Sequence, residues 1–205
     1  GGSVVISQYI GRKALAAAGE AASQLFLFSI LFSSLTAILV FAGKEVILQL
    51  LFGKVDDEVM EACVIYLTIS AYSYPALAVY NAGAALLRSL GKTRFTMYLS
   101  FASNFINVIG NLIGVFVLHG GVAGVAYPSL AARMFSAVVI TIYCFQCQNA
   151  VVYRSKWIFQ WKQEMMNHIL KIAIPNGMEN GAFQLVKVAL SSLAALFGTY
   201  QIAAN

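Results

Sequence analysis

Three charged side chains, Arg133, Glu179 and Lys187, lie inside stretches of sequence that are otherwise apolar. A charge is costly within a lipid bilayer, so such groups normally face the interior of a helix bundle and mark routes for ions or substrates. Glu179 and Lys187 are eight residues apart, about 12 Å along a helix, so they share a face without direct contact. These groups predict charge-dependent binding along a transport path. Structural roles stay open, namely an ion pair elsewhere for Glu179 and a helix-end carbonyl partner for Arg133.

A row of amides occupies one helical face. Asn104, Asn107 and Asn111 follow the spacing i, i+3 and i+7, which places them together on a helix. Amides that face lipid are expensive, so this face must meet protein or water. Two interpretations stay open: hydrogen bonds between helices, and the wall of a polar cavity for organic cations, which also lie over aromatic rings. Other residues that suit such a cavity are Gln8, Tyr80, Asn81 and Gln184.

The three prolines, Pro75, Pro128 and Pro175, all fall inside apolar stretches. A proline frees a backbone carbonyl and kinks a helix, and in lipid the freed group must find a partner. Prolines are also tolerated in membrane helices more often than in soluble ones. We predict hinges at these positions, which favours a moving transporter over a static anchor.

The elements that must position these residues are apolar helices. Of the 205 residues, 60% are hydrophobic and 10% are charged, whereas soluble domains carry about 25% charged residues. The charge-free stretches are long enough to cross about 30 Å of hydrocarbon as helices. They do not alternate as membrane strands do. We therefore predict an all-α, polytopic transmembrane helix bundle with spans before Arg12 and at 25–43, 62–87, 95–118, 121–152 and 169 to the end.

The connecting loops alternate in charge. Nine of the thirteen Lys and Arg residues fall in the first, third and fifth loops, and two fall in the second and fourth. The positive-inside rule then places the odd loops in the cytoplasm. Within the loops, residues 44–52 predict a short amphipathic helix on the outer surface. Residues 157–166 interleave aromatic and basic side chains, as interfacial segments do.

No residue set points to an enzyme, a metal site or a cofactor. A Ser/His/Asp set and a phosphate loop are both lacking. Cys144 and Cys147 form a C-x-x-C pair without a second pair or nearby histidine, so we interpret them, with Cys63, as small apolar side chains. The net charge of +5 lies between apolar runs and indicates membrane orientation, not nucleic-acid binding. Because both ends lie in apolar sequence, we expect a longer protein.

Four segments in order resemble one family of transporters. Residues 5–13 resemble the end of the second helix and its loop, and residues 85–94 the loop between helices four and five. Residues 121–133 resemble the start of helix six. The segment from Ile174-Pro175-Asn176-Gly177 to the end resembles helix seven. The family is the multidrug and toxic compound extrusion (MATE) family.

The resemblance implies twelve helices in two six-helix lobes, of which this chain would hold helices two to seven. Residues 1–153 would form part of the N-terminal lobe, 154–168 a cytoplasmic linker, and 169–205 the first helix of the C-terminal lobe. It further implies a multi-pass plasma-membrane antiporter that is monomeric when complete. Such a protein expels cationic small molecules in exchange for Na⁺ or H⁺, without a cofactor.

The sequence departs from the family at one position. Some members carry an acidic ion ligand further along helix seven, where this chain has Phe183, whereas Glu179 follows Pro175 by only four residues. The role of Glu179 as that ligand therefore stays open. Two other functions also stay open. A flippase of lipid-linked precursors would need a more basic cavity than Arg133 and Lys187 provide, and a non-transporting membrane subunit would not need charges inside its spans.

Overall fold

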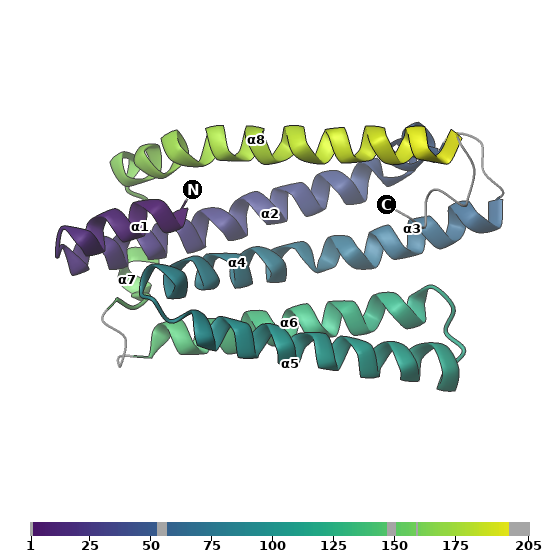
Figure 1. Ribbon diagram of the computed structural model, residues 1–205, viewed down its shortest axis with the longest axis horizontal. Helices are drawn as coiled ribbons and strands as arrows, with labels where there is room; N and C mark the ends of the chain where they lie inside the picture. The colour runs from purple at the N-terminus through teal and green to yellow at the C-terminus, as the bar shows by residue number, and fades with distance from the viewer. Residues whose placement is uncertain (1, 53–56, 147–150, 159, 197–205) are drawn as a thin grey trace.

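The computed structural model describes residues 2–52, 57–146, 151–158 and 160–196. Figure 1 shows an elongated bundle with α8 along one side, α5 and α6 along the opposite side, and α2, α3 and α4 between them. The predicted all-α class is confirmed, since all regular elements of the described residues are helices: α1 Gly2–Gly11, α2 Leu15–Phe52, α3 Asp57–Tyr72, α4 Tyr74–Ser89, α5 Thr93–Leu112, the π-helix η1 Ile113–Val117, α6 Ala123–Phe145, α7 Ser155–Ile158 and α8 Gln163–Leu196.

Within the described residues, three helical stretches are long and apolar enough to cross a membrane: Leu15–Leu48, Thr93–Val117 and Ala123–Phe145. The bent pair α3 and α4 would be a fourth. These four match four of the predicted charge-free spans. α1 is only 10 residues long. α8 is long enough, but with Lys171, Glu179 and Lys187 it does not reach the same apolarity.

α2 extends further than its charge-free stretch. The sequence predicts a separate surface helix at 44–52, and this prediction is wrong, because α2 runs unbroken from Leu15 to Phe52. No proline interrupts this stretch, and an isolated Gly43 costs a helix only about 1 kcal/mol. The Lys44 ammonium lies 4.9 Å from the centroid of the Phe41 ring. A cation–π contact thus helps to accommodate the first charge beyond the apolar stretch.

The predicted span 62–87 is broken in the middle. α3 ends at Tyr72, α4 begins at Tyr74, and the two helices meet at an angle of 42°. Pro75 lies in the first turn of α4, where its missing N–H is harmless, and it disfavours helical backbone in the residue before it. The Ser73 hydroxyl donates to the Ser70 carbonyl at 2.7 Å and so satisfies one end of α3. By contrast, Pro128 and Pro175 lie inside the continuous helices α6 and α8.

Small residues bring α5 and α6 into backbone contact. A Cβ on Gly114 would lie 2.0 Å from the Gly124 carbonyl oxygen, and a Cβ on Gly110 would lie 2.5 Å from Pro128 Cβ. Gly110 and Gly114 form a small-xxx-small pair on one helix, and Gly124 and Pro128 meet it from the other. Such spacing lets membrane helices pack closely. The sequence indicates Gly120 and Gly124 as a packing pair. The two lie close together, and Gly124 also meets Gly114 of η1, which continues α5.

The segment after α6 is fastened to α2. The predicted span 121–152 is too long, because α6 ends at Phe145 and Gln146 has extended backbone. The Lys162 ammonium lies 2.8 Å from the Glu20 carboxylate. Ser23 accepts a hydrogen bond from the Arg154 N–H at 3.3 Å, and the Gln24 amide binds the Gln160 carbonyl. Three residues on one face of α2 thus hold the predicted linker 154–168, which contains α7 and the first turns of α8.

The loops of like charge gather at the same end of the bundle. In Figure 1 the α1–α2 and α4–α5 turns and the α6–α8 connection lie at one end, and the α2–α3 and α5–α6 connections lie at the other. We expect Cys at position 92 to be labelled from the cytoplasm and Cys at position 57 from outside. The measurement is labelling of intact cells with an impermeant maleimide, in a background without the native cysteines. Labelling of position 92 alone in intact cells would reverse the topology.

Candidate functional site

The polar residues of α5 and α6 face one another. The Asn107 amide donates to the Ser129 hydroxyl at 2.8 Å, and the Asn111 amide donates to the Asn107 carbonyl oxygen at 3.1 Å. Both asparagines are partly buried. The Asn107 bond joins α5 to α6, as the first of the two interpretations of the amide row expects, and the Asn111 bond lies within α5. Ser129 was missed, although Ser129, Arg133 and Ser136 follow the spacing i, i+4 and i+7 on α6.

Further along the same face, a cavity of about 100 Å³ with several polar residues in its lining lies between α4, α5 and α6. Arg133 lines it from the middle of α6, and its Nη1 donates to the Ser73 hydroxyl at 2.5 Å. The structure thus places Arg133 at the break between α3 and α4, next to a side chain and not at a helix-end carbonyl. The other polar residues of the cavity are Tyr80, Ser100, Ser103, Asn104 and Ser136. The structure therefore joins three of the predicted site residues, Tyr80, Asn104 and Arg133.

The remaining predicted residues lie elsewhere. Gln8 on α1 and Asn81 on α4 are exposed and do not line this cavity. Glu179, Gln184 and Lys187 project from the exposed part of α8. Among the described residues, none of these three makes a hydrogen bond or an ion pair. The structure does not bring them to the Arg133 cavity.

The backbone around Pro175 is regular. Asn176, Gly177, Asn180 and Gly181 predict a loosened helix around Glu179, but α8 passes through them without a break. The Asn176 amide donates to the Ile172 carbonyl at 3.2 Å, and the Asn180 amide donates to the Asn176 carbonyl at 2.8 Å. These side chains bond to backbone carbonyls one turn earlier, within the continuous helix. The prediction of a loosened helix is therefore wrong.

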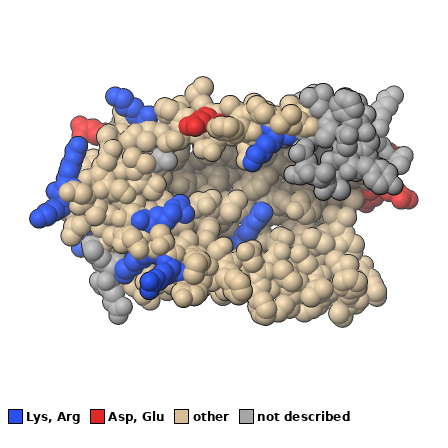
Figure 2. All heavy atoms as spheres, in the orientation of Figure 1, with Lys and Arg blue, Asp and Glu red and all other residues tan. Residues whose placement is uncertain are grey.

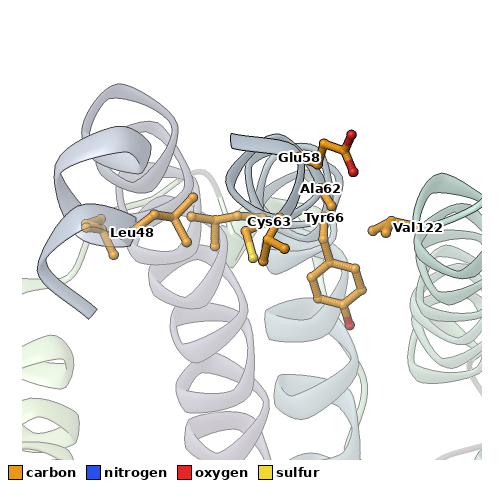
Figure 3. A pocket seen from close by; sticks show the side chains of 9 residues that line it. Leu48, Glu58, Ala62, Cys63, Tyr66 and Val122 are labelled. Atoms are coloured by element: carbon orange, nitrogen blue, oxygen red, sulfur yellow. The ribbon is translucent and has the colours of Figure 1, made fainter. Parts of the chain in front are cut away.

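A larger cavity of about 640 Å³ is lined mainly by apolar side chains of α2 and α3. Figure 3 shows Leu48 to one side of α3, Val122 to the other, and Tyr66 projecting from α3 itself. The Glu58 carboxylate lies at its edge and Cys63 within it. An apolar groove of this kind fits lipid contact and lacks the convergent polar groups of a binding site.

The face shown in Figure 2 is hollowed between α8 and the helices opposite. Lys and Arg side chains lie on both sides of the hollow. The described residues contain no group of three His, Cys, Asp or Glu side chains that could hold a metal ion. Cys144 is buried, Cys63 is partly buried, and Cys147 lies outside the described residues. Just before the linker, burial raises the pKa of Tyr153 well above its ordinary value, and nearby Cys144 adds to the effect.

Comparison with known proteins decides the family. The family model described as MatE matches residues 1–113, more than half of the chain. The chain belongs to the MATE family. Its members are membrane transporters, and the resemblance noted in the sequence is confirmed. The last nine residues of the helix-seven segment, 197–205, lie outside the described residues.

This MATE chain is similar to several longer proteins. It is 27% identical to the "Uncharacterized transporter YisQ" of Bacillus subtilis over 97% of the chain and 44% of that protein. It is 22% identical to the "Probable multidrug resistance protein NorM" of Thermotoga maritima over 72% of the chain and 32% of that protein. The chain thus spans less than half the length of these relatives.

Solved structures share the fold. A MOP superfamily transporter from Pyrococcus furiosus superposes with a TM-score of 0.87 and 20% identity, over 98% of this chain and 44% of that one. Its description states that a reverse polarity of the binding pocket suggests a different function. At this identity the likeness concerns the fold alone.

The packing role of Asn107 in this MATE chain can be tested against the cavity role of Asn104. We expect Asn107→Leu to destabilise the protein by about 1 kcal/mol, because it removes an interhelical hydrogen bond and leaves Asn111 without its acceptor. Thermal unfolding in detergent should show the loss, and a double-mutant cycle with Ser129→Ala should show coupling. Asn104→Leu is the matched control, with near-normal stability. Equal melting temperatures for all variants would contradict the packing role.

Proposed function

We propose that the protein containing this MATE chain exports organic cations and drugs across the plasma membrane by antiport with Na⁺ or H⁺. The observation that carries the proposal is the cavity between α4, α5 and α6 in a chain that belongs to a family of transporters. This cavity holds the charged side chain of Arg133, together with Tyr80 and Asn104. A membrane anchor gains nothing from such a charge, whereas a transporter uses it.

The exposed part of α8 supports a second lobe. Residues 174–187 are exposed at nearly every position, including Ile174, Met178, Phe183 and Leu185. In contrast, Met166 and Ile169 at the start of the helix are buried. The two-lobe arrangement of the family would place further helices against this face, with the substrate path between the lobes. Residues 1–153 then form part of the first lobe, and α8 belongs to the second.

The test is dye efflux by the full-length gene product that contains this chain. Cells that lack their main efflux pumps are loaded with a fluorescent organic dye, and the loss of fluorescence is followed after energisation. We expect faster efflux than in cells with an empty vector, and its abolition when the coupling gradient is dissipated. Separate collapse of the Na⁺ and H⁺ gradients identifies the coupling ion. Efflux equal to the vector control for a broad panel of dyes would contradict the proposal.

A further inference from the structure

Arg133 is the one charged residue of the first-lobe span sequences 21–43, 62–87, 95–118 and 121–145. These ranges contain no aspartate or glutamate. A guanidinium stays charged at any physiological pH, and a charge within a span requires compensation. The side chains around Arg133 therefore indicate which charge a ligand group bound there would carry.

The described residues compensate this charge only in part. Nη1 donates to the hydroxyl of Ser73, a neutral partner that itself donates to the Ser70 carbonyl. A guanidinium has five N–H donors, so most of them remain for another acceptor. Among the described residues, no carboxylate pairs with Arg133, and the Glu20 carboxylate pairs with Lys162.

The cavity beside Arg133 offers donors and no acid. Ser100, Asn104 and Tyr80 line it, and among the described residues none of these three side chains has a hydrogen bond elsewhere. The hydroxyls of Ser103 and Ser136 already donate hydrogen bonds to the Ala132 carbonyl, at 3.1 and 3.0 Å. Ser100 and Asn104 are exposed, so the cavity opens to the surface of the described helices. A guanidinium with amide and hydroxyl donors around it is an arrangement for an oxyanion.

The size of the cavity limits what enters it. Its volume of about 100 Å³ is well below that of a site for a whole drug-sized molecule, which takes about 300–1,000 Å³. It has room for one anionic group of a larger compound, whose remainder would lie outside the cavity. A compound with positive charge only would be repelled by the uncompensated guanidinium.

We propose that the Arg133 cavity is an anion subsite that binds the carboxylate or phosphate of an exported compound. The proposal rests on the proposed export function and refines its substrate class from organic cations to zwitterionic and anionic organic compounds. Arg133 supplies charge-assisted hydrogen bonds, and Ser100, Asn104 and Tyr80 supply neutral ones. Ser73 positions the guanidinium from the break between α3 and α4.

The experiment compares two dyes that differ only in one charge, a rhodamine with a free carboxylate and its ethyl ester. Equilibrium binding to the purified full-length gene product in detergent is measured by fluorescence anisotropy, and efflux is measured in cells. We expect the wild type to bind the free acid more tightly than the ester. Arg133→Gln should weaken binding of the acid about 10- to 100-fold and leave the ester unchanged or tighter. Arg133→Lys should retain part of the preference, and Arg94→Gln, a basic residue at the start of α5, is the matched control.

Competition identifies the source of the anion. Displacement of the acid dye by benzoate supports a carboxylate of a soluble compound, and displacement only by dodecyl phosphate supports a lipid-linked phosphate. Equal wild-type affinity for the acid and the ester would overturn the subsite. An equal loss of affinity for both dyes in Arg133→Gln would overturn it too, because it would indicate a structural role for Arg133. Efflux of both dyes alike would overturn the subsite and leave export intact. Arg133-dependent binding without efflux would overturn export and leave the subsite intact.

Discussion

Gly114→Ala is expected to destabilise this protein by about 2 kcal/mol, although alanine is the better helix former. The new Cβ would lie 2.0 Å from the Gly124 carbonyl oxygen and 2.8 Å from its carbon, and both are backbone atoms. Backbone cannot rotate away as a side chain does, so α5 and α6 must separate. Overpacked sites typically lose about 1–3 kcal/mol, which outweighs the gain of up to about 1 kcal/mol from helix propensity.

The consequences of that separation reach the polar site. The Gly114 carbonyl also accepts the Gly120 N–H at 3.0 Å, so the turn between the helices depends on the same contact. The α5–α6 interface that it closes contains the hydrogen bond between Asn107 and Ser129. We therefore expect Gly114→Ala to lower the melting temperature in detergent by about 4–8 °C and to reduce efflux with it.

Gly43→Ala is the matched control for this substitution. Gly43 lies inside α2, and a Cβ there would meet only side-chain carbons of Ile47 at 3.6 and 3.9 Å, which is ordinary van der Waals contact. The same chemical change should therefore leave stability unchanged or raise it by about 0.5–1 kcal/mol. Gly114→Ala with a melting temperature equal to that of Gly43→Ala would show that the backbones of Gly114 and Gly124 are not in contact.

The sequence predicts the helices well because charge and hydropathy act locally. Absence of charge over about 20 residues identifies a span whatever surrounds it, and the described α2, α5 and α6 all contain such a stretch. The ends are harder to predict, because a charged residue such as Lys44 continues a helix when a neighbouring ring accommodates it. The break at Ser73 is equally hard to predict from the sequence. A proline accompanies the break before α4, whereas Pro128 lies inside the continuous helix α6.

The candidate site is predicted only in part because its contacts join different helices. Spacing places Asn104 and Asn107 on one face, but it does not show that Asn107 meets Ser129 while Asn104 opens to a cavity. Arg133 is conspicuous as an isolated charge, yet its partner Ser73 is 60 residues away. The Gly114–Gly124 contact likewise depends on which helices are neighbours. Such pairings follow from the order of helices in space, and periodicity along one helix contains no information on that order.

Glu179→Gln in the full-length gene product is expected to lower ion-driven efflux severalfold at normal expression. Glu179 lies well inside α8, among exposed residues, and has no ion-pair partner in the described part of the chain. A carboxylate within a span is retained at a cost, so it is expected to bind or exchange something. The proposed antiport supplies the exchange, because a proton, Na⁺ or a cationic group can occupy the carboxylate in turn.

The choice of glutamine isolates the charge. Glutamine keeps the shape of the side chain and its capacity for hydrogen bonds, so packing against helices of a second lobe would survive, whereas exchange of a cation would not. Glu179→Asp keeps the charge and should retain part of the activity. Glu164→Gln is the matched control, since Glu164 is an exposed carboxylate on the same helix, in its first turn. Efflux is measured as initial rates over a range of pH and Na⁺ concentration. If Glu179→Gln matches the wild type at every pH and Na⁺ concentration, Glu179 has a structural role, and the coupling site lies on other helices.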